Sequence, residues 1–424
     1  MIKKNNMLKS PGGMRSFLPV VALELKNIEK EIVEVFRLWG YQPIITPTLE
    51  YFESLREGMG RTMDKKLYKF IDYEGNILSL RPEMTAPIAR TLSTRLNDIQ
   101  LPLRLSYNAS VFRYDQPQTG KNREIYQLGV EFIGEKNYLA DAEAIILAIE
   151  SIQNTGLKDF RIDIGHAGFL NGIIEELELD EDIEFEIKTF LNKKDLVGLN
   201  NYIMEMNDSE REILKKIPLL RGSLEILDYA DELVNNEKSI EAIKNLKTVY
   251  QYIEDHNLAE YITFDLGLIR GFDYYTGVVF EGFTEKLGYT ICGGGRYDNL
   301  LKKYSGVKIP AIGFAIGIER VRLALKRQGY KAEQKAMDQL IIYNPGTEST
   351  ALNTAHKLRH RGYVTVTIAA EDEEKKFIED AKKKGLKRIL FFKNSKELVI
   401  KDIKNNQETK VSLEKGWEDK LWQI

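Results

Sequence analysis

The chain has 424 residues, of which 43% are hydrophobic and 29% are charged, and its net charge at pH 7 is only -3. This length accommodates two or three domains and excludes a small disulfide-stapled scaffold. The balanced charge gives no electrostatic reason to expect a nucleic acid or a membrane as partner. The one cysteine, Cys292, cannot form an internal disulfide, and no apolar stretch approaches the roughly 20 residues that span a bilayer. We therefore expect a cytoplasmic protein without a signal peptide.

The first predicted element is a long amphipathic helix over residues 23–39. Its apolar side chains recur at helical spacing, and Gly40 follows where helices commonly end. The next run, residues 41–46, is rich in residues that favour strands and ends at Pro47. Because proline cannot donate a hydrogen bond to a neighbouring strand, this strand should end there or lie at a sheet edge.

The following three hundred or so residues predict an α+β domain. Runs typical of strands occur at 77–80, 103–114, 124–133, 160–164, 264–268 and 277–283. Their short turns favour antiparallel pairing. Residues 140–152 form a helical stripe, and residues 171–260 have helical periodicity throughout, which indicates a helical insertion in a core domain that spans residues 1–330.

A second, smaller domain is predicted after a polar linker around residues 326–337. Its pattern is strand 339–343, helix 350–361, strand 363–368, helix 371–384, and strands 388–392 and 398–403. This βαβαββ order predicts a small α/β domain over residues 337–424. Its acidic and basic residues are almost balanced, whereas a tRNA-binding face is usually clearly basic.

Common cofactor motifs are missing from the sequence. There is no P-loop, and the glycines at 293–295, 313 and 317 do not form a dinucleotide fingerprint. His356 and His360 have the spacing of a metal pair on a helix, but basic residues surround them. We expect neither a cofactor nor a metal site.

One strand has the pattern of a ligand-binding floor. A period of two places Gln127, Gly129 and Glu131 on the same face of the run 124–133. Two polar side chains would then flank a glycine, over which a small polar ligand could approach the backbone closely. Exposed polar residues on a surface strand would explain the same pattern.

Six stretches of the sequence together resemble the catalytic core of the histidyl-tRNA synthetase family, which has the class II aminoacyl-tRNA synthetase fold. They are LRPEMT at 80–85, VFRYDQPQ at 111–118, QLGVE at 127–131, RGFDYYTG at 270–277, GGGRYD at 293–298 and GFAIGIER at 313–320. The resemblance implies an antiparallel sheet flanked by helices. It also implies a homodimer built partly by the helix 23–39 and the strand that ends at Pro47.

The resemblance further implies which residues form the site. The positions that surround histidine in this family correspond to Glu83, Thr85, Arg113, Gln127, Glu131, Arg270, Tyr274 and Tyr275. The positions that hold ATP phosphates correspond to Arg113, Arg123 and Arg320. Arginine suits both tasks because its guanidinium group can bind carboxylate or phosphate with two hydrogen bonds.

Two branches share this core: the tRNA ligases, and the regulatory subunits of ATP phosphoribosyltransferase, which charge no tRNA. Met84 stands where the ligase pattern LRPEGT has glycine, and the runs MTAPIAR at 84–90 and RIDIGHAGF at 161–169 resemble the regulatory branch. The ligase segment of the type NPLRxLD is missing. The alternative that this comparison leaves open is a histidine-tRNA ligase, for which the retained arginines are the best argument.

Membership of the regulatory branch implies a protein without catalytic residues of its own. It would bind L-histidine and the short-form ATP phosphoribosyltransferase catalytic subunit. The resulting complex performs the first step of L-histidine biosynthesis under feedback control by histidine. In this interpretation tRNA is not expected as a partner, and the ATP-binding arginines are vestigial.

Overall fold

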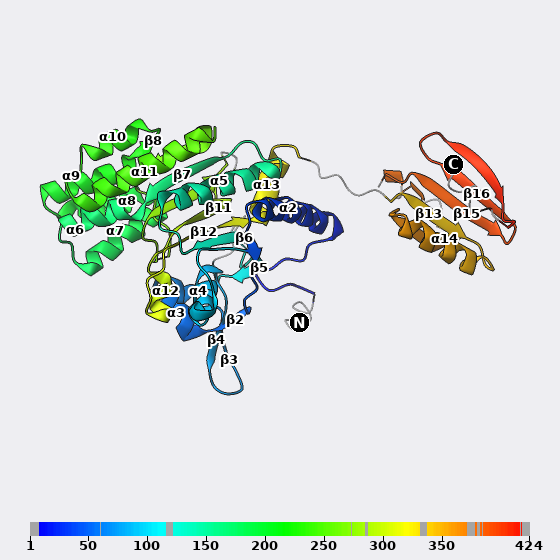
Figure 1. Ribbon diagram of the computed structural model, residues 1–424, viewed down its shortest axis with the longest axis horizontal. Coiled ribbons are helices and arrows are strands. Elements are labelled where there is room, and N and C mark those ends of the chain that lie inside the picture. The colour runs from blue at the N-terminus through cyan, green and yellow to red at the C-terminus, as the bar shows by residue number, and fades with distance from the viewer. Residues whose placement is uncertain are drawn as a thin grey trace. The chain divides into compact units, whose positions relative to one another are not determined.

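The computed structural model describes residues 8–59, 61–115, 122–272, 274–284, 287–330, 337–370, 378–379, 382–383, 385–415 and 417. The chain forms two compact units, Met1–Tyr330 and Lys331–Ile424. Each unit has its own buried core, and Figure 1 shows the elements of both. Among the described residues, no helix combines the length and the apolar character needed to cross a bilayer.

A nine-stranded sheet forms the centre of the first unit, with the order β1-β5-β6-β12-β11-β10-β7-β9-β8. Most neighbours are antiparallel. The strands are β1 Gln42–Pro43, β5 Leu103–Phe112, β6 Glu124–Ile133, β7 Arg161–His166, β8 Arg221–Gly222, β9 Ile262–Asp265, β10 Val278–Phe283, β11 Cys292–Arg296 and β12 Ala311–Gly317. The predicted strand at 41–46 is reduced to β1, which lies at the sheet edge. This position suits Pro43 within the strand, because proline cannot donate a hydrogen bond to a neighbouring strand.

Helices cover both faces of this sheet (Figure 1). One face packs against α2 Pro19–Leu38, α5 Tyr138–Asn154, α11 Glu237–Asp255 and α13 Ile318–Arg327. The other face packs against α4 Thr85–Ser93 and α12 Leu300–Ser305, next to α3 Phe52–Met59. Helix α2 begins four residues earlier than expected because Pro19 occupies its first turn, where proline needs no hydrogen-bonded N–H.

Three strands of the central sheet, β8, β11 and β12, were not among the predicted strands. Strand β11 carries the glycines 293–295, and its interior position follows from their lack of side chains. A Cβ atom at Gly294 would lie 2.1 Å from the carbonyl oxygen of Gly313 on the neighbouring strand. The glycine run therefore fits a crowded central strand rather than a turn.

The predicted helical insertion lies between strands β7 and β9. It contains α6 Ala167–Glu176, α7 Glu181–Lys193, α8 Leu196–Tyr202, α9 Asp208–Lys216, α10 Glu225–Asp231 and α11. Antiparallel pairing was favoured from the short turns, but β7 and β9 are parallel. The physical reason is that a parallel pair needs a long crossover connection, which the insertion supplies.

A small separate sheet, with the order β2-β4-β3, packs beside α3 in the first unit. Its strands are β2 Leu49–Tyr51, β3 Lys69–Ile71 and β4 Ile77–Leu80. Only β4 has the bounds that the sequence predicted. Figure 1 shows that the β3–β4 hairpin projects from the main body of this unit.

The second unit is an α/β domain around a five-stranded sheet with the order β14-β13-β15-β16-β17. Its elements are β13 Gln339–Tyr343, α14 Glu348–His360, β14 Thr365–Ala369, β15 Arg388–Asn394, β16 Glu397–Asp402 and β17 Gln407–Ser412. The helix predicted over 371–384 lies mostly outside the described residues. Strand β17 was missed because all but one of its side chains are exposed, so it carries no apolar alternation.

Candidate functional site

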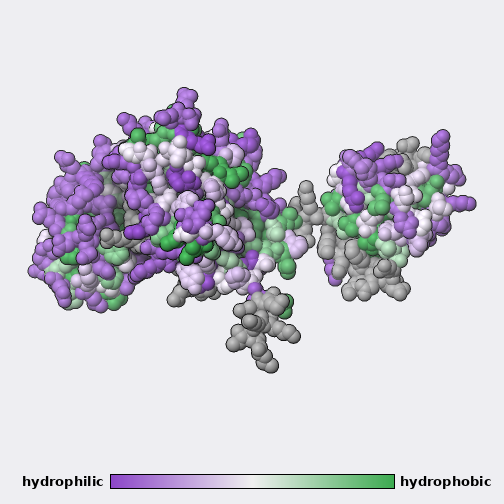
Figure 2. All heavy atoms as spheres, turned by 90° about the horizontal axis from the view of Figure 1, so that it is seen from below, coloured by the Kyte–Doolittle hydropathy of each residue, from purple (hydrophilic) through white to green (hydrophobic). Residues whose placement is uncertain are grey.

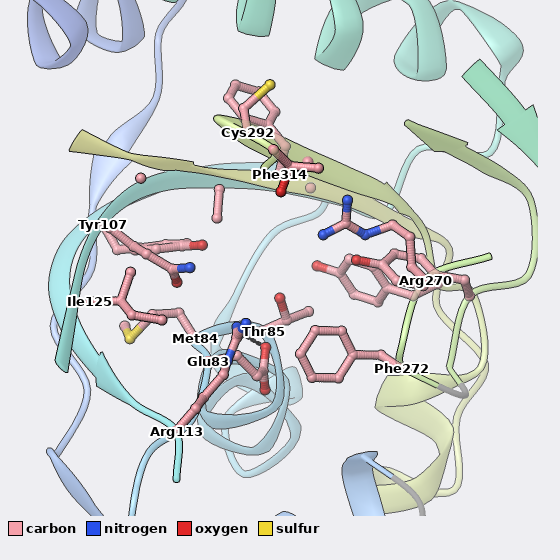
Figure 3. Close-up of a pocket in the computed structure, with 18 of the residues that line it drawn as sticks. Glu83, Met84, Thr85, Tyr107, Arg113, Ile125, Arg270, Phe272, Cys292 and Phe314 are labelled. Carbon is pink, nitrogen blue, oxygen red and sulfur yellow. Dashed lines mark hydrogen bonds between the residues drawn. The ribbon is translucent and has the colours of Figure 1, made fainter. Parts of the chain in front are cut away.

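A pocket lies between the central sheet and the N-terminal end of α4 (Figure 3). Glu83 and Thr85 face it from that helix end, and Tyr107 lies on the opposite side from Arg270 and Phe272 (Figure 3). It brings together seven of the eight residues expected around histidine: Glu83, Thr85, Arg113, Gln127, Arg270, Tyr274 and Tyr275. The eighth, Glu131, is in contact with this lining and is described below.

Glu83 fixes the beginning of helix α4. Its two carboxylate oxygens accept hydrogen bonds from the backbone N–H groups of Thr85, at 2.6 Å, and Ala86, at 2.7 Å. A carboxylate is favourable there because it satisfies N–H groups that have no partner within the helix. The side chain is nevertheless buried, and this burial raises the pKa of Glu83 above its ordinary value.

Glu131 is the second acid of the pocket and is only 1% exposed. One carboxylate oxygen accepts a hydrogen bond from the Thr85 hydroxyl at 2.7 Å, and the other accepts one from the Tyr297 hydroxyl. A Cβ atom at Gly313, its neighbour on β12, would lie 1.9 Å from this carboxylate, so only glycine leaves room for it. Burial raises the pKa of Glu131 to about 8, despite the two hydrogen bonds.

The two acids are connected through Thr85. Among the described residues, no cationic side chain is bonded to Glu131. Thr85 links them, because its N–H donates to Glu83 and its hydroxyl donates to Glu131. The nearby negative charge of Glu83 adds to the effect of burial on the pKa of Glu131. A ligand that brings a positively charged group into the pocket would therefore be stabilised by both carboxylates.

We predict that Glu131 makes the stability of the protein without ligand depend on pH. Below its ordinary pKa of 4.5 the acid is protonated in both the folded and the unfolded chain. Between pH 4.5 and about 8 only the folded chain keeps the proton, so stability should fall by up to about 1.4 kcal/mol per pH unit as the pH rises. Chemical unfolding at pH 5.5 and 7.5 measures the change. The free energy of unfolding should fall more between these two pH values for the wild type than for Glu131→Gln. An equal loss in both proteins would contradict the raised pKa.

Aromatic rings form one side of the pocket. Phe272 stacks on Tyr274 with ring centroids 5.2 Å apart, and Tyr274 contacts Tyr275 at 4.8 Å and Tyr297 at 5.8 Å. The guanidinium of Arg113 stands 5.5 Å from the Phe272 ring. This cluster supplies flat, largely apolar surface for a ring-containing ligand beside the polar groups.

The arginines of the site are held by backbone and side-chain acceptors. Arg270 donates to the carbonyl of Phe280 at 3.0 Å and to the Glu281 carboxylate at 2.9 Å. Arg113 donates to the carbonyl of Pro82 at 2.8 Å, and Arg320 donates to that of Thr290 at 2.7 Å. These contacts fix each guanidinium group at the pocket wall and leave further N–H groups for a ligand.

Arg123 is the one expected ATP-binding residue that is not part of the lining. Its guanidinium lies 4.1 Å from the centre of the Tyr114 ring and donates to the carbonyls of Asp115, at 3.0 Å, and Gly12, at 3.3 Å. The other two, Arg113 and Arg320, both line the pocket. The structure thus brings together only part of the expected phosphate-binding set.

Sequence reasoning missed Tyr107, which fills the space above Gly129. A Cβ atom at Gly129 would lie 2.3 Å from the Tyr107 hydroxyl oxygen, so the glycine makes room for this tyrosine rather than for a ligand. The signal was present, because Tyr107 lies opposite Gly129 in the β5–β6 pair, but the register is a tertiary property. Cys292 also lines the pocket, and burial raises the pKa of its thiol to about 12, so it stays neutral.

No group of three or more histidine, cysteine, aspartate or glutamate side chains that could hold a metal ion occurs in the part of the chain that the structure describes. His356 and His360 are exposed neighbours on α14, with ring centroids 4.3 Å apart. They lie in the second unit, whereas all lining residues of the pocket belong to the first.

Comparison with known proteins first identifies the class. The family model of histidyl-tRNA synthetase matches residues 13–321. The solved histidyl-tRNA synthetase from Nostoc sp. PCC 7120 has a TM-score of 0.76 and covers 98% of this chain and 99% of that chain. Its sequence identity is 23%, so this likeness concerns the fold alone. The α+β class II synthetase fold predicted from the sequence is thereby confirmed.

More similar relatives identify the branch. The ATP phosphoribosyltransferase regulatory subunit of Halothermothrix orenii is 54% identical over 94% of this chain and 97% of its own length. The corresponding subunit of Desulforamulus reducens is 38% identical over 90% of this chain and 94% of its own. A crystal structure from Bacillus halodurans, described as an ATP phosphoribosyltransferase regulatory subunit/histidyl-tRNA synthetase, has a TM-score of 0.80 at 34% identity, covering 91% and 98% of the two chains. The chain belongs to the family of ATP phosphoribosyltransferase regulatory subunits.

Proposed function

We propose that this protein is the non-catalytic regulatory subunit of an ATP phosphoribosyltransferase and binds a short-form catalytic subunit. The complex carries out the first step of L-histidine biosynthesis in the cytoplasm, and histidine inhibits it by feedback. The observation that carries this proposal is the pair of buried carboxylates, Glu83 and Glu131, in a pocket where none of the described residues gives Glu131 a bonded counter-charge. Such a pocket suits a small cationic ligand with a ring, as an amino acid sensor requires.

In this proposal eight residues bind L-histidine. The carboxylates of Glu83 and Glu131 bind its positively charged amino group and its imidazole ring, and the arginines bind its carboxylate. The full set is Glu83, Thr85, Arg113, Gln127, Glu131, Arg270, Tyr274 and Tyr275. Binding then shifts the complex toward an inhibited state, because histidine has different affinities for the two states.

Met84 supports a binding role rather than a ligase role for this pocket. Its side chain is 1% exposed and lies in a cluster with Tyr107 and Ile125 at the pocket wall. The ligase pattern has glycine at this position, so the methionine fills space beside Glu83 that a ligase leaves open. Arg113, Arg123 and Arg320 are then vestiges of an ATP site, and no catalytic residue is assigned.

The proposal is tested by reconstitution with the catalytic subunit. Purified protein should co-elute with a short-form ATP phosphoribosyltransferase and raise its rate of joining ATP to phosphoribosyl pyrophosphate, and histidine should lower that rate. The same preparation should not charge histidine tRNA when a known ligase serves as positive control. Robust charging without any effect on the phosphoribosyltransferase would instead establish a histidine-tRNA ligase.

We further propose a homodimer, built partly by the helix 23–39 and the strand that ends at Pro47, that also buries the exposed apolar side chains of the small sheet. Large apolar residues on β2, β3 and β4 are exposed: Leu49, Tyr51, Phe70, Ile71 and Ile77. Figure 2 views the first unit from the side on which this sheet lies, and pale and green surface occurs there among the hydrophilic purple. The register places Leu49, Tyr51 and Phe70 on one face of this sheet and Ile71 and Ile77 on the other. Exposed apolar side chains of this kind are typical of an interface between proteins.

Replacing Ile71 by aspartate should weaken this dimer at least tenfold. Ile71 is 78% exposed, so the change should leave the folded monomer intact, while the interface loses apolar area and gains a buried charge. Sedimentation at a series of concentrations measures the dissociation constant. Leu352→Asp, on the exposed side of α14, is the matched control and should have no effect. Equal dissociation constants for the two variants would contradict the proposed interface.

A further inference from the structure

A second cavity, of about 440 Å³, lies on the other side of the wall formed by Arg270, Phe272 and Tyr275. Helices α6 and α7 of the insertion and the segment 268–272 enclose it. None of the eight residues proposed for histidine lines it except the two in the shared wall. Its volume is within the range of roughly 300 to 1,000 Å³ that is usual for small-molecule sites.

The cavity has an apolar floor and one accessible aromatic ring. Leu170, Leu268 and Val279 are buried and form the floor. Phe185, from α7, lines the cavity while remaining 47% exposed. A large aromatic residue in such a position offers one face for a flat ligand to stack on.

His166 lines the cavity and carries one ring N–H that is not bonded to any of the described residues. It caps helix α6, and its Nδ1 accepts a hydrogen bond from the Gly168 N–H at 3.0 Å. Burial, helped by the charge of Arg296, lowers the pKa of His166 to about 4, so the ring is neutral at physiological pH. Because Nδ1 is an acceptor, the proton must be on Nε2, and His166 lines the cavity.

Further polar side chains around the cavity are available to hydrogen-bond a ligand. Asn171, Thr189 and Asn192 line it, and their side chains have no hydrogen-bond partner within the part of the chain that the structure describes. An amide side chain presents a donor and an acceptor side by side. This is the arrangement that pairs with the edge of adenine.

The charges around the cavity disfavour an anionic ligand. Glu181 and Glu184 lie on the α7 wall, and Lys188 is already paired with Glu184. The positive charge of Arg270 is matched by Glu281, 2.9 Å away. Among the described lining residues, the remaining charge is therefore that of Glu181, which would repel phosphate groups.

We propose that this cavity binds an uncharged purine, as a free base or a nucleoside. The ring would stack on Phe185 over the apolar floor, the His166 N–H would donate to a ring nitrogen, and the Asn171 amide would pair with the ring edge. Purine binding would not depend on the histidine pocket, because Phe185, His166 and Asn171 line the second cavity and not that pocket.

Calorimetric titration of the full-length protein with adenosine tests the proposal, with ATP as the charged comparison. Adenosine should bind at least tenfold more tightly than ATP. Phe185→Ala and Asn171→Ala should each weaken adenosine binding at least tenfold. Both side chains lie at least partly at the surface, so the variants should melt like the wild type. Asn200→Ala, on the exposed face of α8, is the matched control and should leave binding unchanged.

Three results would overturn the proposal. The first is no heat with adenosine up to millimolar concentration. The second is ATP binding more tightly than adenosine, which would indicate a phosphate site. The third is undiminished adenosine binding in both Phe185→Ala and Asn171→Ala, which would place the ligand elsewhere on the protein.

Discussion

Replacing Glu131 by glutamine should lower the affinity of the protein for histidine at least 100-fold. Glutamine keeps the size of the side chain. Its one amide oxygen can still accept a hydrogen bond from Thr85 or Tyr297, and its NH2 group can donate to the other hydroxyl, but it cannot become negatively charged. The ligand cation would then face only Glu83 in a buried pocket. Loss of one partner of a buried, hydrogen-bonded charge pair typically costs about 2 to 5 kcal/mol, and about 2.7 kcal/mol corresponds to 100-fold.

Calorimetric titration of histidine into the purified protein measures this effect. Glu212→Gln, on the exposed surface of α9, removes the same charge outside the pocket and should bind histidine as the wild type does. A Glu131→Gln protein that melts normally and binds histidine with wild-type affinity would remove Glu131 from the site. If the wild type binds no histidine even in complex with the catalytic subunit, the proposed sensor function itself is wrong.

Replacing Arg296 by methionine should destabilise the first unit by about 3 to 5 kcal/mol, the usual cost of removing one partner of a buried ion pair. Arg296, on β11, donates to the Asp141 carboxylate at 2.7 Å and to the carbonyl of Glu135 at 3.1 Å. Asp141 is 0% exposed, and without the arginine the Asn245 amide, at 3.4 Å, is its one remaining side-chain hydrogen-bond partner among the described residues. The variant therefore leaves a carboxylate buried without a counter-charge.

The size of this effect should depend on pH in a defined direction. Burial raises the pKa of Asp141 to about 6 even with Arg296 present, and removing the arginine must raise it further. Below pH 6 the acid can take up a proton and become neutral, so the loss measured by chemical unfolding should be smaller at pH 5 than at pH 8. Arg37→Met, which removes an exposed ion pair with Glu34, is the control and should hardly change the unfolding midpoint at either pH. If Arg296→Met lowered the free energy of unfolding as little as the control does, the buried ion pair would not stabilise the fold as predicted.

Local sequence patterns determined many of the regular elements. Strand β6 and strand β13 have the bounds that were predicted, because alternating or continuous apolar runs bounded by polar residues indicate strands directly. The helix before Gly40 was also expected, and that glycine has the positive φ of +80° that favours glycine after a helix. Such features depend on neighbours in the chain, so they can be recognised without a fold.

Motif residues determined the location of the site. Glu83, Gln127 and Arg270 lie far apart in the sequence, and only the resemblance of their motifs to one family predicts that they lie together. The pocket brings these three residues to its wall. Met84, within the same motif, separated the regulatory branch from the ligases, and the relatives confirm that assignment.

The tertiary structure decided what depends on contacts between distant segments. The glycine-rich strand β11, the tyrosine above Gly129 and the position of Arg123 outside the pocket all follow from how strands and loops pack, which periodicity does not encode. The raised pKa of Glu131 and the second cavity belong to the same group. The sequence by itself thus determined many of the elements, the family and most of the residues that were expected at the pocket and line it. Burial, register and enclosed space required the fold, because each is created by residues that meet only when the chain is folded.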